Sequence, residues 1–226
     1  MSRKNALITG AAKRIGREIA IALSAAGWNV VVHYNKTKPD WPKSVQADLN
    51  NFGEVTGLVK RAQDVLGGEI NLLINNASIF EKVSFAETSE DVFDRHMSLH
   101  VKAPFFLAQA FAAQTKDGQI INMLDTNIVR NKTTYFAYLL SKKSLGSLTQ
   151  MLAVELAPNI RVNAVCPSTI EGFSSNLDKD YLLQREKELP MGKFANLQSV
   201  LDAILFLTTS QLTGQEIFVD GGEQLI

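Results

Sequence analysis

Short apolar runs alternate with stretches in which apolar residues recur at helical spacing along this chain. The runs have the length and the β-branched content of buried strands, and the longer stretches have the amphipathic period of helices. The predicted strands are Ala6–Thr9, Trp28–Tyr34, Val45–Asp48, Ile70–Ile74, Gln119–Met123, Ile160–Val165 and Glu216–Val219. The predicted helices are Arg14–Ala26, Val55–Leu66, Ser89–Gln114, Thr134–Leu156, which Pro158 stops, and Gln198–Thr208.

This alternation predicts parallel strands joined by right-handed crossovers. The resulting fold class is α/β: a single-domain Rossmann-type, doubly wound parallel sheet with helices on both faces, over residues 1–226. Two segments break the pattern. Asn35–Ser44 carries two prolines and is too short for a crossover helix, so we expect a loop. Residues 168–194 come after a strand, show little periodicity and resemble a substrate-covering lid. Ligands of such sheets bind beyond the carboxyl ends of the strands.

Composition narrows the classes of function. The 226 residues contain 23 basic and 23 acidic side chains, so charge gives no reason to expect a nucleic acid or an anionic membrane as partner. Cys166 is the one cysteine, which excludes an internal disulfide and suits a reducing compartment. The longest apolar run, Ala103 to Ala113, is far shorter than a membrane span, and Asn5 to Thr9 is too short for a signal peptide. We therefore expect a cytoplasmic protein.

The first strand leads into Thr9-Gly10-Ala11-Ala12-Lys13-Arg14-Ile15-Gly16 and then a helix. Gly10 would allow a tight turn and Gly16 a close approach of helix and strand, and the helix N-terminus would offer N–H groups to a pyrophosphate. Arg14 stands where a middle glycine is usual, and its guanidinium would suit phosphates. Lys13 is a candidate phosphate contact as well; the alternative is that it is simply an exposed basic residue at the start of the helix.

The choice of cofactor depends on the residues just after the second strand. Dinucleotide sites for NAD commonly carry an acidic residue there, whereas this chain has His33-Tyr34-Asn35-Lys36. Lys36 would attract a 2′-phosphate, so the sequence predicts NADPH rather than NADH. Asp48-Leu49 would receive the adenine amino group, and Asn75-Asn76-Ala77 would lie along the ribose.

Tyr138 and Lys142 are four residues apart and share one face of a predicted helix. Tyr138 follows Asp125 by thirteen residues. The ammonium would stabilise the phenolate and bring the pKa of the phenol toward the working pH, which makes Tyr138 a candidate proton donor. Asp125 would orient Tyr138 or a water molecule. Because a carboxylate would repel the oxyanion that develops on a ketone, Asp125 favours an amino-bearing, protonatable substrate.

Together these motifs resemble the short-chain dehydrogenase/reductase family over practically the whole chain. The matching stretches, in order, are Thr9–Gly16, Asp48-Leu49, Asn75-Asn76-Ala77, Tyr138 with Lys142, Arg161–Val165 with Pro167, Leu212–Gln215 and Val219–Gly222. Asp125 in place of the family's usual Ser, together with Arg14 in the glycine loop, resembles the pteridine reductase branch. In that branch the Ser of the turn, here Ser78, contacts the ligand, and an aromatic residue in the place of Phe80 stacks the pterin against the nicotinamide. Ordinary core packing is the alternative for Phe80.

His100 stands four residues before Pro104, where the family usually has Asn. The bacterial dihydromonapterin reductases of the same branch resemble this chain in having His there. His100 would take part in a proton relay; an ordinary interior histidine is the alternative. Neither His33, His96 nor Cys166 has metal-ligand spacing with it, so no metal is expected.

The resemblance implies reduction of a dihydropterin by NADPH, with 7,8-dihydromonapterin, dihydrobiopterin and dihydrofolate as candidates. Two alternatives stay open: a carbonyl reductase acting on a 3-oxoacyl thioester or a xenobiotic ketone, and a nucleotide-binding sensor without turnover. The family also implies dimers or tetramers through the two long helices and the C-terminal strand. The predicted catalytic residues are Asp125, Tyr138, Lys142 and His100. The predicted substrate contacts are Arg14, Ser78, Phe80, Asp125 and Tyr138. The predicted cofactor contacts are Gly10, Lys13, Arg14, Ile15, Gly16, His33, Tyr34, Asn35, Lys36, Asp48, Leu49, Asn76, Ala77, Ser78, Tyr138, Lys142, Pro167 and Thr169.

Overall fold

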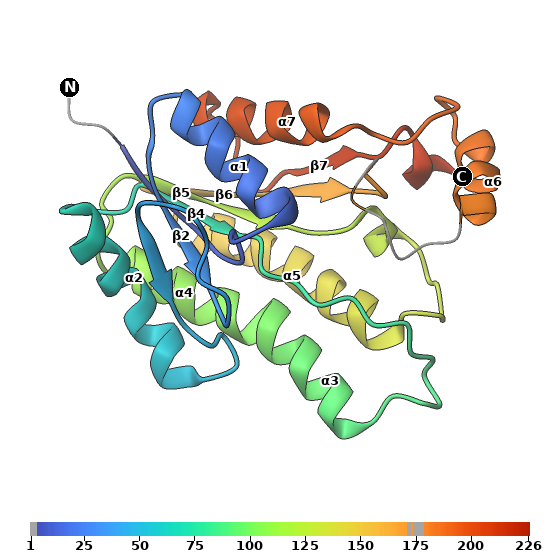
Figure 1. The fold of residues 1–226 in the computed structure, drawn as a ribbon, viewed down its shortest axis with the longest axis horizontal. Coiled ribbons are helices and arrows are strands. Elements are labelled where there is room, and N and C mark those ends of the chain that lie inside the picture. The colour runs from blue at the N-terminus through green and yellow to red at the C-terminus, as the bar shows by residue number, and fades with distance from the viewer. Residues whose placement is uncertain (1–3, 171–172, 174–178) are drawn as a thin grey trace.

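The computed structural model describes residues 4–170, 173 and 179–226 and contains one seven-stranded sheet. All of its strands are parallel, in the order β3-β2-β1-β4-β5-β6-β7 (Figure 1). The strands are β1 (Asn5–Ile8), β2 (Asn29–Tyr34), β3 (Ser44–Gln46), β4 (Leu72–Asn75), β5 (Gly118–Met123), β6 (Ile160–Pro167) and β7 (Glu216–Val219). The predicted fold class is confirmed.

Helices cover both faces of the sheet, with α1 and α7 on one side and α2, α4 and α5 on the other (Figure 1). The helices are α1 (Arg14–Ala25), α2 (Phe52–Leu66), α3 (Glu90–Met97), α4 (Ala103–Ala112), α5 (Phe136–Glu155), α6 (Lys179–Glu188) and α7 (Leu197–Thr209). Short 3-10 turns form at η2 (Thr126–Val129) and η3 (Glu223–Leu225). No helix in the described part of the chain is both long and apolar enough to cross a membrane.

The strands divide their side chains between two cores. Leu7, Val31 and Leu73 pack in the core beneath α2 and α4, whereas their neighbours Ile8 and Val32 pack in the core beneath α1 and α7. Successive residues of a strand point to opposite faces, so a sheet covered on both sides needs apolar residues at every position. This requirement explains why β1 and β4 are buried throughout.

The long helix predicted at Ser89–Gln114 is interrupted. A π-helical turn, η1 (Ser98–Lys102), joins α3 to α4. Pro104 has no N–H to donate to the carbonyl of His100 four residues earlier, and the N–H of Ala103 bonds the carbonyl of Ser98 instead. The interruption therefore occurs where His100 lies, and such bulges are frequent at functional sites.

Residues 168–194 were predicted to be irregular, and this is wrong for α6. Its sequence is strongly polar, so it lacks the apolar stripe from which a helix is predicted. Residues 171–172 and 174–178 of the predicted lid lie outside the described residues. Helix α2 begins at Phe52, three residues earlier than predicted, because the side chain of Asn51 accepts hydrogen bonds from the N–H groups of Gly53 and Glu54.

Candidate active site

The polar motifs meet at the carboxyl edge of the sheet. Gly10 follows β1, Asn76 follows β4, Asp125 follows β5 and Pro167 ends β6. Strands β1 and β4 are adjacent although β2 and β3 lie between them in sequence, so the order of strands reverses at this point. Ligands of open α/β sheets bind at such a reversal.

The turn after β1 is packed tightly against the turn after β4. A Cβ on Gly10 would lie 2.7 Å from the Cα of Ala77, and one on Gly16 would lie 2.5 Å from the side-chain nitrogen of Asn76. The Asn76 amide donates to the carbonyls of Thr9 (2.9 Å) and Gly10 (3.2 Å). The hydroxyl of buried Thr9 accepts from the N–H groups of Asn76 and Ala77. These contacts fix the shape of the predicted phosphate turn, and Asn76 acts as its brace.

Arg14 adopts a left-handed backbone conformation, with φ of 56°. Glycine adopts this conformation at no cost, whereas a side chain there costs about 1 kcal/mol, and such strain is concentrated at functional sites. The guanidinium is exposed and donates to the carbonyl of Phe173, which follows β6. Helix α1 starts here with no side-chain cap at Lys13 and no acidic residue in its first turn. Its free N–H groups are therefore suited to an anion such as a pyrophosphate.

His33 lies behind this turn. Its Nδ1 accepts from the N–H of Gly10 (3.0 Å), so its Nε2 carries the proton and donates to the carbonyl of Ala47 (3.0 Å). Burial lowers the pKa of the ring. A neutral His33 thus braces the glycine turn against the end of β3, and its direct contact with a cofactor stays a prediction.

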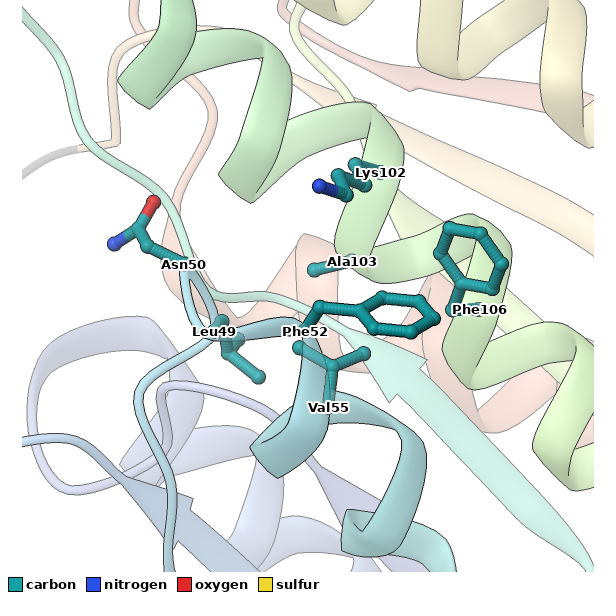
Figure 2. Close-up of a pocket in the computed structure, with 7 residues that line it drawn as sticks. All are labelled: Leu49, Asn50, Phe52, Val55, Lys102, Ala103 and Phe106. Carbon is teal, nitrogen blue, oxygen red and sulfur yellow. The ribbon is translucent and has the colours of Figure 1, made fainter.

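The residues predicted to select the cofactor lie at the carboxyl ends of β2 and β3. Asn35 and Lys36 are exposed after β2, with Tyr34 half-buried before them. Asp48 accepts from the N–H of Asn50, and Leu49 is buried. Figure 2 shows Leu49 beside Phe52 of α2, near Lys102 and Phe106 of the helical rod formed by η1 and α4. Contact of these residues with a cofactor stays a prediction.

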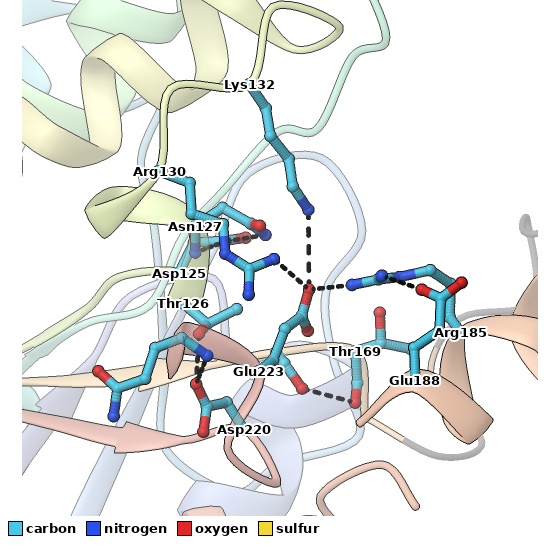
Figure 3. Close-up of polar contacts among 12 residues, drawn as sticks. Asp125, Thr126, Asn127, Arg130, Lys132, Thr169, Arg185, Glu188, Asp220 and Glu223 are labelled. Atoms are coloured by element: carbon cyan, nitrogen blue, oxygen red, sulfur yellow. Dashed lines mark hydrogen bonds and ion pairs between the residues drawn. The ribbon is translucent and has the colours of Figure 1, made fainter. Parts of the chain in front are cut away.

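Asp125 is the centre of the opposite half of the site. The hydroxyl of Tyr138 donates to its Oδ2 at 2.8 Å. Its Oδ1 accepts from the N–H of Asn127 (2.7 Å) and from the Asn127 side chain (2.8 Å), contacts that begin η2 (Figure 3). Tyr138 is buried, and burial together with the Asp125 charge raises the pKa of its phenol well above 10. The prediction that the phenol pKa is lowered toward the working pH is therefore wrong.

Lys142 is also buried, one helical turn after Tyr138. Its ammonium donates to the carbonyl of Met123 (2.7 Å) and lies 5.8 Å from the centre of the Tyr138 ring. Burial lowers its pKa to about 8, although Asp125 and Cys166 act in the opposite direction. The ammonium is thus held near the phenol and does not reach it directly.

We expect kcat/KM to fall as the pH rises through about 8, because Lys142 loses its positive charge there. The profile of kcat/KM against pH reports the ionisations of the free enzyme and is the measurement. In Lys142→Arg the side chain keeps its positive charge throughout this range of pH. We therefore expect that kcat/KM of this variant does not fall at alkaline pH, even if it is lower than that of the wild type. The same alkaline fall in both proteins would contradict the assignment.

His100 connects the turn after β4 to α5. Its Nε2 accepts from the N–H of Ile79 (3.2 Å) and lies 3.0 Å from the hydroxyl of Ser78. The ring proton is therefore on Nδ1, which donates to the hydroxyl of Ser141 (2.8 Å), and this hydroxyl donates to the carbonyl of Tyr138 (2.7 Å). Burial and the Lys142 charge lower the pKa of His100 well below 6.5. A neutral His100 positions Ser78 relative to Tyr138, and a role in proton transfer stays a prediction.

Phe80 extends from the same turn into solvent, with 57% of its surface exposed. Its ring stacks on Tyr135 (4.5 Å between centres) and meets the Tyr138 ring edge-on (4.8 Å). An exposed aromatic face beside Tyr138 is suited to a flat ring. The core-packing alternative does not fit this exposure.

The remaining predicted residues lie at the edges of the site. Lys13 is exposed and Ile15 is half-buried, packed on the core beneath α1. Pro167 pairs with Val219 at the end of β6, and Thr169 is half-buried just beyond it. Cys166 is buried, which raises the pKa of its thiol. Within the described part of the chain, no group of three or more His, Cys, Asp or Glu residues could hold a metal ion.

Sequence reasoning missed several residues that shape the site. Thr9 was visible as the first residue of the glycine motif, and Tyr135 as an aromatic residue one helical turn before Tyr138. Asn122 could have been found only through the pairing of β4 with β5, because it accepts from the side chain of Asn75 across the two strands.

Comparisons with known proteins agree with this architecture. A family model described as Enoyl-(Acyl carrier protein) reductase matches residues 10–224. L-xylulose reductase from Bos taurus is 34% identical, over 98% of this chain and 97% of that protein. A solved structure of FolM, alternative dihydrofolate reductase 1 from Brucella suis in complex with NADP, is 32% identical with a TM-score of 0.91, over 99% of this chain and 96% of that one. Aldohexose dehydrogenase from Thermoplasma acidophilum, 24% identical over 99% of this chain and 95% of that one, shares the fold with a TM-score of 0.89. The chain belongs to the short-chain dehydrogenase/reductase family.

Proposed function

We propose that this short-chain oxidoreductase uses NADPH to reduce the ring C=N bond of a dihydropterin to the tetrahydro form. The observation that carries the proposal is the 2.8 Å hydrogen bond from Tyr138 to the carboxylate of Asp125. A carboxylate at this place would repel the negative charge that develops on a ketone oxygen. It would instead accept hydrogen bonds from the amino and N–H groups of a pterin, with the strength of a charge-assisted pair.

The residues present fit NADPH. The free N–H groups of α1, with no acidic residue in the first turn, suit the pyrophosphate, and the exposed Arg14 and Lys36 suit phosphate groups. The Brucella suis FolM structure at 32% identity contains NADP, which supports the same cofactor here. Bound NADPH supplies the hydride. The protein's own contribution is to hold the ring and to provide a proton.

Tyr138 is the proposed proton donor. Its raised pKa keeps the phenol protonated at neutral pH, so the proton is available throughout. When the proton leaves, the Lys142 ammonium would stabilise the phenolate. A pterin amino group bound to Asp125 would meanwhile offset the carboxylate charge, which favours the loss of this proton. The exposed ring of Phe80 would cover one face of the pterin, and the hydroxyl of Ser78 would meet its rim.

Isotopic labelling tests the proposed transfer of hydride from NADPH to the pterin. With NADPH that carries deuterium at the transferred position, we expect one deuterium in the tetrahydropterin, as measured by mass spectrometry. An unlabelled tetrahydro product, or none, would contradict the proposed reaction.

A carbonyl reductase is the second candidate, favoured by the 34% identity to bovine L-xylulose reductase. It would use the same Tyr138 and Lys142. The two candidates differ in what Asp125 does: its carboxylate would accept from the N–H groups of a pterin ring but would repel the negative charge that develops on a carbonyl oxygen.

We further propose that the chain forms dimers or tetramers through α4 and α5. Phe105, Met151 and Val154 are exposed apolar residues on these two helices. Size-exclusion chromatography with light scattering gives the number of subunits; a monomer would contradict the proposal.

A further inference from the structure

One carboxylate oxygen near the candidate active site forms ion pairs with three cationic side chains. Oε1 of Glu223, in η3, lies 2.8 Å from Arg185 of α6, 3.5 Å from Arg130 and 3.7 Å from Lys132 (Figure 3). The Glu223 side chain is only 7% exposed. Three segments distant in sequence therefore meet at one anion.

The cluster contains more positive than negative charge. Arg185 also pairs with Glu188, so three cations share two carboxylates. Burial lowers the pKa of Lys132, and the neighbouring Arg130 and Arg185 lower it further, whereas Glu223 acts in the opposite direction. Asp125 is the weakest of the charges that act on Lys132. Among the groups joined by these ion pairs, cations therefore outnumber carboxylates by one.

Hydrogen-bond donors are also in excess. Lys132 is 39% exposed, and its ammonium donates no hydrogen bond to any of the residues that the structure describes. The Nη2 of Arg130 is enclosed without an acceptor in the same part of the chain. An enclosed donor without an acceptor is costly, so an anionic acceptor would stabilise Arg130. The partly exposed ammonium of Lys132 is accessible to the same anion.

The cluster adjoins the reacting groups. Arg130 follows Asp125 by five residues, directly after η2, and η2 contacts η3, where Glu223 lies. Figure 3 shows Lys132 directed toward Glu223 from the chain segment that carries Asp125. A ligand whose ring lies against Asp125 would thus have its substituent within reach of Lys132.

We propose that Lys132, with Arg130 and Arg185, forms an anion subsite that binds a carboxylate on the tail of the substrate. The inference rests on the proposed pterin reduction and deepens it, because it separates two classes of dihydropterin. Dihydrofolate carries two carboxylates on its glutamate, both ionised at neutral pH. Dihydromonapterin carries only hydroxyl groups. The subsite therefore favours the folate class.

The test compares KM for dihydrofolate with KM for 7,8-dihydromonapterin in the wild type, Lys132→Gln and Lys116→Gln. Lys116 is exposed just before β5, at the amino ends of the strands and thus away from the candidate active site. Lys116→Gln is the control, because it removes the same charge at a distance from the proposed subsite. In Lys132→Gln we expect the KM for dihydrofolate, divided by the KM for 7,8-dihydromonapterin, to rise about tenfold. This is the effect of losing one partly buried charge pair. Lys116→Gln should keep the wild-type ratio. Rising salt should raise the wild-type KM for dihydrofolate more than that for dihydromonapterin.

An unchanged ratio in Lys132→Gln, while both substrates are turned over, would overturn the subsite and leave the proposed function intact. Failure of the wild type to reduce dihydrofolate, 7,8-dihydromonapterin and dihydrobiopterin alike would overturn the function itself. Inorganic phosphate, added with NADPH at saturation so that it does not compete for the cofactor site, is the remaining probe: inhibition equal for both substrates would overturn the tail assignment. Phosphate that competes with dihydrofolate alone would support it.

Discussion

Tyr138→Phe is expected to lower kcat for a dihydropterin by about 10²–10⁴-fold, the usual loss when a positioned proton donor is removed. The substitution deletes the hydroxyl that donates to Asp125 and keeps the ring against which Phe80 packs. Steady-state oxidation of NADPH with saturating pterin measures the effect. NADPH affinity should change little, because the ring and Lys142 remain.

Tyr135→Phe is the matched control. Tyr135 lies three residues before Tyr138, its ring stacks on Phe80, and the substitution likewise removes one hydroxyl group from a tyrosine. Its loss of kcat should be much smaller. Equal losses in both variants would indicate that the aromatic cluster, rather than the Tyr138 proton, is what the reaction needs. The thermal unfolding midpoint of each variant separates either result from misfolding.

Asp125→Ser is expected to change the preference between substrates. For a dihydropterin, loss of the charge-assisted hydrogen bonds should cost about 2 to 3 kcal/mol of transition-state stabilisation, which is roughly 30- to 150-fold in kcat/KM. For a ketone such as L-xylulose, kcat/KM should rise, because a hydroxyl group does not repel the developing oxyanion. The measurement is kcat/KM for both substrates with NADPH.

Asp125→Asn tests charge separately from shape. The carboxylate accepts from Tyr138 with Oδ2 and from Asn127 with Oδ1, whereas the amide of Asn keeps one of these two acceptors and the size of the side chain. If the charge is what selects the pterin, Asp125→Asn should lose pterin activity nearly as Asp125→Ser does. Full pterin activity in Asp125→Asn would refute the electrostatic argument.

The sequence predicts the sheet well because buried parallel strands are continuous apolar runs. The last strand, Glu216–Val219, has the predicted bounds, and the other strands differ by at most a few residues at their ends. Helix α6 could not be predicted, since its contacts are ionic: Arg185 pairs with Glu223, thirty-eight residues later in the chain. The π-helical turn was also hidden, because its effect on the hydrogen bonds of the helix is not visible in the apolar pattern.

The site was predictable where one short motif carries the chemistry. Gly10, Gly16, Tyr138 and Lys142 are recognisable from spacing, and the two glycines make close contacts that leave no room for a side chain. The raised pKa of Tyr138 could not be inferred from spacing, because it is caused by burial and by the Asp125 charge, and the spacing shows neither the burial nor the contact. Lys132 and Glu223 are ninety-one residues apart, and only the fold brings them together.

The central claim, that the substrate is a dihydropterin, is tested most directly by kcat/KM with NADPH for 7,8-dihydromonapterin, dihydrobiopterin and dihydrofolate beside L-xylulose and a 3-oxoacyl thioester. We predict that at least one dihydropterin is reduced with a kcat/KM well above those of both carbonyl compounds. Efficient reduction of the carbonyl compounds, with no turnover of any dihydropterin, would contradict the claim.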